Sequence, residues 1–218
     1  MSYNAINSLC KIIFNIINTP IQLNHYADTT KSRSSYLPLL ELSVKEDPED
    51  DRNTHYLARE YLFHGYYKKA ITTFKKHLRL KSATWDLERC ASLRYIAYCY
   101  KQLNRPALQK QFLIKAILEA NYIREPYYDL AIYYYEHKKY LEAILFFNEM
   151  LKITDRTLTY MSQPQCWNNS VYDYLSICYY EIGDLKNSLK NIEIAIKLNP
   201  EKRLIKNKEF IISKINNN

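Results

Sequence analysis

The feature that most constrains the fold is a pattern of apolar and small residues that recurs four times along the 218-residue chain. The first copy lies between Asn53 and Leu80, where two runs with helical spacing are separated by Gly65. Apolar residues at positions i, i+3, i+4 and i+7 are typical of amphipathic helices, and a glycine between two such runs indicates a turn. Ala58 in the first run and Ala70 in the second supply small side chains where two antiparallel helices must approach closely. The segment therefore predicts a helical hairpin.

Three further copies follow, and each has a small residue in the place of Ala58. These residues are Ala97, Ala131 and Ser176, and the four positions lie 39, 34 and 45 residues apart. A period of about 34 residues is that of a two-helix repeat, so the first and last intervals contain insertions between hairpins. The longer insertion, residues 154–169, has no helical period and predicts a structured loop.

The copies resemble the tetratricopeptide repeat, in which the first helix carries an aromatic residue, a leucine and a small residue, and the second carries alanine and then phenylalanine. The match is closest in the third copy, with Tyr127, Leu130, Ala131, Tyr134, Tyr140, Ala143 and Phe147. The resemblance implies an all-α fold, a right-handed superhelical solenoid of about four helical hairpins with flanking capping helices. Two glycines in the whole chain and no long alternation of apolar and polar residues also favour an all-α protein.

The extent of the repeats predicts that the chain has two parts. Residues 34–216 form the repeat domain, and residues 1–33 form an N-terminal segment with a short helix or strand and a loop. The apolar cluster in residues 1–20 is too short to span a bilayer, so we expect no membrane segment. Helices are expected over residues 36–45, before the first hairpin, and 203–215, where a last helix would cover the apolar end of the stack.

The net charge of +8 is spread over most of the predicted helices, where lysines alternate with acidic residues. This distribution is typical of a solvated surface, so nucleic acid is not the expected partner. The five cysteines have no C-x-x-C spacing and predict neither a disulfide framework nor a zinc site. A reducing compartment, the cytoplasm, fits this pattern.

The sequence gives little indication of catalysis. The histidines have no partner at the spacing of a metal site or of a nucleophile and its base, and no glycine-rich loop is present to bind phosphate. We therefore expect no catalytic residue, no metal and no cofactor, and the chain is not expected to be an enzyme.

A second, more specific resemblance lies in the stretches of sequence that depart from the repeat pattern. The phrases SYLPLLELSVKEDP from Ser35, ATWDLERCASLRYIA from Ala83, REPYYDLA from Arg124 and TLTYMSQPQCW from Thr157 resemble the C-terminal repeat region of family 2 glycosyltransferases. The resemblance runs from Gln22 to Phe210. It implies a repeat region that follows a catalytic domain with a D-x-D metal motif. No D-x-D occurs here, and a lone His25 does not replace that site.

A stack of hairpins forms a concave groove lined by the first helix of each pair, and such grooves bind extended or helical peptides. Helical projection places nine candidate partner-binding residues in it: Arg52, His55, Arg59, Arg94, Tyr98, Lys101, Tyr128, Tyr135 and Tyr180. Arginine pairs with carboxylates and tyrosine gives a large contact area, so a peptide with an acidic end and an apolar body would suit the groove. The alternative is that some of these residues pair internally, for example Arg94 with Glu125.

The expected function is a non-catalytic protein–protein interaction module or scaffold. Two other functions remain open. One is an accessory or remnant portion of a family 2 glycosyltransferase that recognises an acceptor protein and works with a separate catalytic partner. The other is an RNA-binding solenoid, which would combine basic side chains with aromatic stacking.

Overall fold

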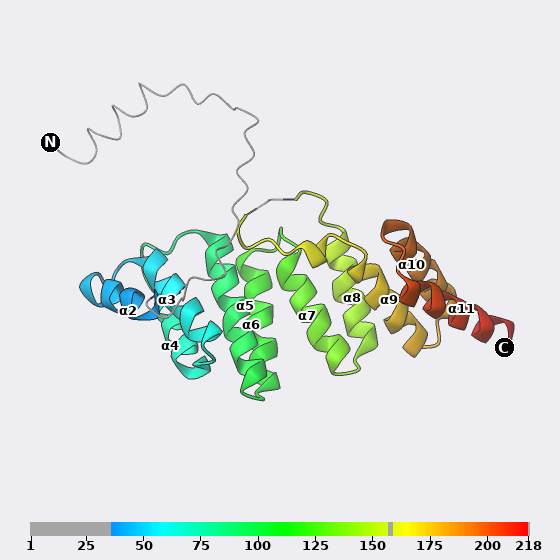
Figure 1. Cartoon of the computed structure of the whole chain (residues 1–218), viewed down its shortest axis with the longest axis horizontal. Coiled ribbons are helices and arrows are strands. Elements are labelled where there is room, and N and C mark those ends of the chain that lie inside the picture. The colour runs from blue at the N-terminus through cyan, green and yellow to red at the C-terminus, as the bar shows by residue number, and fades with distance from the viewer. Residues whose placement is uncertain (1–35, 157–158, 218) are drawn as a thin grey trace, which may run out of the picture. The chain divides into compact units, whose positions relative to one another are not determined.

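The computed structural model describes residues 36–156 and 159–217 (Figure 1). The chain divides into two units, Met1–Arg33 and Ser34–Asn218. The expectations for residues 1–33 lie outside the described residues. Within the described ranges there are ten α-helices, one short 3-10 helix and no strand.

The helices follow the predicted repeats closely. Their bounds are α2 Tyr36–Glu46, α3 Asp51–Phe63, α4 Tyr67–His77, α5 Asp86–Gln102, α6 Pro106–Glu119, α7 Glu125–Glu136, α8 Tyr140–Leu151, α9 Ser170–Glu181, α10 Leu185–Leu198 and α11 Lys202–Asn216, with the 3-10 helix η1 at Pro164–Cys166.

Four helical hairpins form the body of the repeat unit. The pairs are α3 with α4, α5 with α6, α7 with α8, and α9 with α10. The second helix of each hairpin also packs on the first helix of the next, so the hairpins lie side by side in chain order (Figure 1). This arrangement is a helical solenoid and confirms the predicted fold class.

Small residues lie where the two helices of each hairpin meet. Each first helix contributes one and each second helix another, and all eight are buried: Ala58 and Ala70, Ala97 and Ala116, Ala131 and Ala143, Ser176 and Ser188. In the last pair each serine hydroxyl donates to the backbone carbonyl of the other serine at 2.9 Å. The backbones therefore approach closely here, which a larger side chain would prevent.

All four hairpins use the same turn between their helices. The seventh residue after each first-helix small residue has a positive φ: Gly65 at 74°, Asn104 at 53°, Lys138 at 56° and Gly183 at 82°. In the first turn the Gly65 amide donates to the Leu62 carbonyl and the Tyr66 amide to the Tyr61 carbonyl, and the other three turns repeat this pair of bonds. This is the Schellman arrangement, in which a left-handed residue ends the helix.

Helices at both ends complete the stack. At the C-terminal end, Leu204 and Ile211 of α11 are buried against Ile192 and Ala195 of α10. Arg203 reaches back to the Asp173 carboxylate on α9 at 2.7 Å. The helix expected at residues 203–215 is thus present as α11, and it covers the last hairpin as predicted.

The insertion between α8 and α9 is an ordered loop in its described part. The Tyr160 hydroxyl donates to Oε2 of Glu88 at 2.6 Å, and the Gln163 amide donates to Oε1 of Glu125 at 3.0 Å. Glu88 and Glu125 lie in the first turns of α5 and α7, so the loop runs over the N-terminal ends of these two helices. Met161 adds an apolar contact with the core.

None of the described helices is both long and apolar enough to span a bilayer. The four cysteines in the described ranges, Cys90, Cys99, Cys166 and Cys178, are buried free thiols.

Candidate functional site

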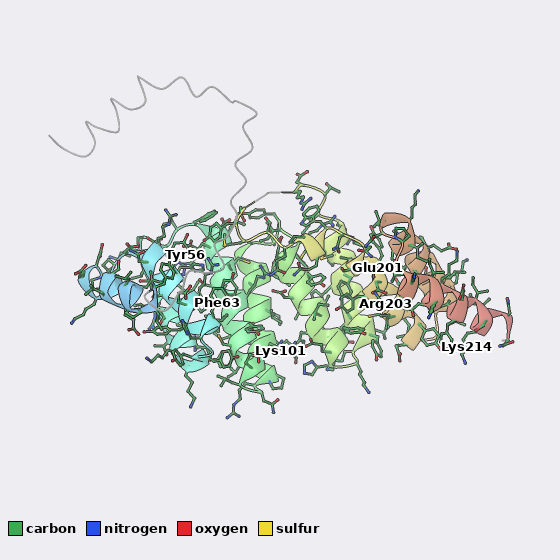
Figure 2. All side chains as sticks on the ribbon, viewed as in Figure 1. Tyr56, Phe63, Lys101, Glu201, Arg203 and Lys214 are labelled. Carbon is green, nitrogen blue, oxygen red and sulfur yellow. The ribbon has the colours of Figure 1, made fainter. Side chains whose placement is uncertain are left out.

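One recess on the described surface is an open pocket of about 390 Å³, formed mainly by the first helices of three hairpins. Its residues come mainly from α3, α5 and α7, with Gln109 and Leu113 added by α6 and Gln163 by the inserted loop. Phe63 and Lys101, at the C-terminal ends of α3 and α5 (Figure 2), are among its lining residues. We call this recess the α3–α5–α7 pocket. Its size is in the lower part of the range of ligand pockets, roughly 300–1,000 Å³.

The pocket presents aromatic and aliphatic side chains to solvent. Tyr98 is 47% exposed and Phe63 is 55% exposed, and Ile132 of α7 is a partly buried lining residue. Large aromatic side chains that remain accessible in a concave surface are typical of interaction sites. The pocket therefore has the chemistry of a surface that accepts apolar groups.

Acidic residues of α7 pair with the basic side chains of α5. Nε of Arg94 donates to Oδ2 of Asp129 at 2.6 Å, and Nζ of Lys101 donates to the carboxylate of Glu136. All four residues line the pocket. Arg94 was expected to pair with Glu125 if it paired internally, but its partner is Asp129, one helical turn further along α7. The two cations are neutralised by the protein itself.

Burial shifts the protonation equilibria of this region. Burial lowers the pKa of Arg94, but the Asp129 carboxylate beside it outweighs this effect and the pKa is raised overall. Burial also raises the pKa of the Tyr128 hydroxyl. At neutral pH the pocket floor therefore has one charged ion pair and a neutral phenol.

Three of the nine predicted groove residues are buried, which corrects the expectation that they form an accessible surface. His55, Arg94 and Tyr128 each lie three residues before the small residue of their helix, and Asp173 is the fourth member of this row. Residues three apart share one stripe of a helix, so this row packs inside the solenoid with Ala58 and its equivalents. Arg94 and Tyr128 still line the pocket floor, whereas His55 is fully buried in the core.

The accessible rows lie one and four positions after each small residue. Tyr98 and Lys101, in these rows, line the α3–α5–α7 pocket. Tyr135 contacts Tyr174 edge-to-face at 4.9 Å between ring centroids, and Tyr180 contacts Phe210 of α11. These two tyrosines are partly buried and lie outside the pocket lining. The fold thus brings only some of the nine predicted groove residues together in one site.

Arg52 and Arg59 are not among the residues that line the pocket, and Arg59 lies beside the inserted loop. Both guanidinium groups are 5.7 Å from the ring centroid of Tyr56, and that of Arg59 is also 5.8 Å from the ring of Tyr160. Tyr160 therefore covers part of the surface that the sequence assigns to partner binding. The loop residues Tyr160 and Gln163 were missed because a segment without helical period gives no register for projection.

His55 has a special environment in the core. Its Nδ1 lies 2.9 Å from the Ser92 hydroxyl, and its ring contacts Phe74 and His77. Burial lowers the pKa of His55 to about 3, so its imidazole is neutral at neutral pH. The residue belongs to a buried polar cluster, not to a peptide-binding surface.

Comparison with known proteins identifies the fold. No family model matches the chain, and no curated protein matches it. Among solved structures, a MamA protein has a TM-score of 0.60 at 16% identity, with 79% of this chain and 95% of that chain covered. YrrB, described as a TPR protein with an unusual peptide-binding site, has a TM-score of 0.57 at 16% identity, covering 78% and 79%. The pilF protein of Pseudomonas aeruginosa has a TM-score of 0.58 at 11% identity, covering 80% and 71%.

These likenesses, all at low identity, concern the fold alone. None of these three structures is described as a glycosyltransferase, so that resemblance rests on the sequence phrases only. The described part of the chain has the fold of the tetratricopeptide-repeat proteins.

Proposed function

We propose that the α3–α5–α7 pocket binds a short peptide segment of another protein and takes up its apolar or aromatic side chains. The observation that carries the proposal is the combination of exposed Tyr98 and Phe63 with a concave floor of partly buried apolar residues. Such concave surfaces are where helical-repeat proteins bind extended or helical segments. The described peptide-binding site of YrrB, a protein of the same fold, supports this role.

The ion pairs of the pocket favour an apolar peptide over a strongly acidic one. Because Arg94 and Lys101 already pair with Asp129 and Glu136, a peptide carboxylate would have to compete with these internal partners. Such a carboxylate would add little to the free energy of peptide binding, since one ion pair replaces another. An acidic group in the peptide would gain most near Arg52, whose side chain is exposed.

The same pairing argues against RNA as the ligand of this pocket. Sequence-independent binding of single strands requires cations that are free to neutralise phosphates. The pocket instead presents two cations and two anions. The proposal thus assigns the chain a binding role with no chemical step.

The experiment that tests the proposal is a selection from a library of short random peptides on the immobilised full chain. Bound peptides are recovered and compared with those retained by Tyr98→Ala. We expect recovered sequences to share apolar or aromatic residues and to be lost from Tyr98→Ala. Equal retention by the two proteins, or enrichment of purely acidic peptides, would contradict the assignment of the pocket.

A further inference from the structure

Three buried side chains with metal-binding atoms meet between the first two hairpins. His55 comes from α3, His77 is the last residue of α4, and Glu88 lies in the first turn of α5. Both histidines are fully buried and Glu88 is 6% exposed. One ligand atom from each residue lies within 4.8 Å of the other two. The cluster is separate from the α3–α5–α7 pocket, whose lining includes none of these residues.

Both imidazoles leave their Nε2 atoms unbonded. Neither Nε2 has a hydrogen-bond partner among the described residues, although both atoms are buried. Nε2 of His77 lies 3.3 Å from Oε1 of Glu88, which is within ion-pair distance but outside the geometry of a well-aligned hydrogen bond. Buried polar atoms without partners are rare in folded proteins because each has lost its bonds to water. Two such atoms on neighbouring rings, next to a carboxylate, indicate that something else satisfies them.

The hydroxyl of Ser92 contacts the same nitrogen, Nδ1, of both rings. Its hydroxyl oxygen lies 2.9 Å from Nδ1 of His55 and 3.0 Å from Nδ1 of His77. A hydroxyl oxygen has two lone pairs, so Ser92 can accept from an Nδ1–H of each ring. Both rings would then be neutral tautomers with a lone pair on Nε2. Metal-bound histidines usually donate from their other nitrogen in this way.

Glu88 is also oriented by a neighbour. Its Oε2 accepts from the Tyr160 hydroxyl at 2.6 Å, which leaves Oε1 directed to the histidines. Around a tetrahedral ion with bonds of about 2.0–2.2 Å, two ligand atoms are about 3.3–3.6 Å apart. The separation of His77 Nε2 and Glu88 Oε1 lies in this range.

We propose that Nε2 of His55, Nε2 of His77 and Oε1 of Glu88 bind one divalent transition-metal ion. Two imidazoles and one carboxylate are a ligand set that suits Zn²⁺. The ion satisfies both buried nitrogens and more than offsets the negative charge of Glu88. Because Tyr160 donates to Glu88, the ion also stabilises the contact between the inserted loop and the first two hairpins.

The test uses the full chain without a polyhistidine tag. The protein is unfolded in a denaturant that contains a chelator, so that bound metal is removed. It is then refolded with and without Zn²⁺ or Co²⁺, because a buried site is loaded most readily as the chain folds. Zinc content after gel filtration, Co²⁺ ligand-field absorption and the midpoint of thermal unfolding are measured. We expect one ion per chain, an absorption intensity typical of four or five ligands, and a higher midpoint with metal.

Variants distinguish this site from other zinc-binding groups. Glu88→Gln keeps the size of the side chain and an acceptor for Tyr160, and it should weaken Zn²⁺ binding at least tenfold. His77→Gln should abolish stoichiometric binding. The matched control is His64→Gln, since His64 is a surface residue outside the cluster. Metal affinity that is equal in all three variants, with circular dichroism unchanged, would overturn the proposal.

If the variants at buried positions do not fold, the site can still be tested on the protein without substitutions. X-ray absorption at the zinc edge should show two imidazole ligands and only nitrogen and oxygen neighbours. Sulfur ligands, fewer than two imidazoles, or no retained zinc after refolding would each overturn the assignment.

Discussion

The Arg94 guanidinium on α5 donates through Nε to the Asp129 carboxylate on α7 at 2.6 Å, and this contact joins the first helices of two successive hairpins. Arg94 is 7% exposed, so its charge depends on Asp129 for most of its stabilisation. The same row of the next repeats contains Asp173, which pairs with Arg203 of α11. Contacts between first helices therefore include buried charge as well as apolar packing.

Removing the carboxylate should destabilise the protein strongly. Asp129→Ala leaves the buried Arg94 cation without a partner, and loss of one member of a buried ion pair costs about 3 kcal/mol. Glu136→Ala is the matched control, because its partner Lys101 is exposed and an exposed pair contributes less than about 1 kcal/mol. Urea unfolding followed by circular dichroism measures both. Equal free energies of unfolding for the two variants would contradict the role given to Arg94.

The turns provide a second test. Gly183→Ala should lower the free energy of unfolding by about 1 kcal/mol, because alanine is strained at a φ of 82°. The space around the added methyl group is open, so backbone strain is the only cost. Lys138→Gly, at the equivalent position of the third hairpin, should instead stabilise by up to about 1 kcal/mol. Changes of the same sign in both variants would show that the turns are not equivalent.

The close approach of the helices gives a third prediction. Ala131 is fully buried between α7 and α8, so Ala131→Leu should destabilise by about 2 kcal/mol through overpacking. Ala107→Leu, at an exposed position of α6, should change the free energy of unfolding by less than about 0.5 kcal/mol. Thermal unfolding compares the two variants. A tolerated leucine at residue 131 would contradict the requirement for a small residue in the hairpin.

The buried cysteines give a prediction about pH. Burial raises the pKa of Cys99 and of Cys178 to about 12, so both thiols stay protonated at pH 8. In Cys10→Ser protein, a thiol reagent at pH 8 should label the four remaining cysteines only after unfolding in urea. Rapid labelling of the folded protein would contradict the burial of these side chains.

The raised pKa values of these thiols lower the stability of the fold in alkali, and burial raises the pKa values of Cys90, Cys166, Tyr61 and Tyr122 in the same direction. Between about pH 9 and 12 the unfolded chain loses the protons of these thiols while the folded chain retains them. The folded state then binds more protons, so the free energy of unfolding falls as pH rises, by up to about 1.4 kcal/mol per pH unit for each thiol. Urea titrations across this range measure the slope.

The sequence was sufficient for the fold because the repeat depends on local patterns. The recurrence of Ala58, Ala97, Ala131 and Ser176 located all four hairpins, and Gly65 marked the first turn. The turns at Asn104 and Lys138 were not recognised, since these residues adopt a left-handed conformation less readily than glycine.

The site was predicted less well, for two physical reasons. Projection of a single helix cannot tell the stripe that faces the next repeat from the stripe that faces solvent, and His55 was therefore placed in the groove. Pairing across repeats depends on long-range geometry, so neither the Asp129 partner of Arg94 nor the contact of Tyr160 with Glu88 could be read from spacing.

The central claim is that the α3–α5–α7 pocket binds a peptide, and the most direct test is the affinity of a selected peptide for matched variants. Fluorescence anisotropy measures the dissociation constant of a labelled peptide with each protein. Phe63→Ala and Tyr98→Ala alter the pocket, whereas Phe210→Ala and Tyr66→Ala remove similarly exposed rings elsewhere. The account predicts at least about tenfold weaker binding, about 1.4 kcal/mol, for the first two variants and no change for the others. Equal affinity for all four variants, or losses confined to Phe210→Ala and Tyr66→Ala, would contradict it.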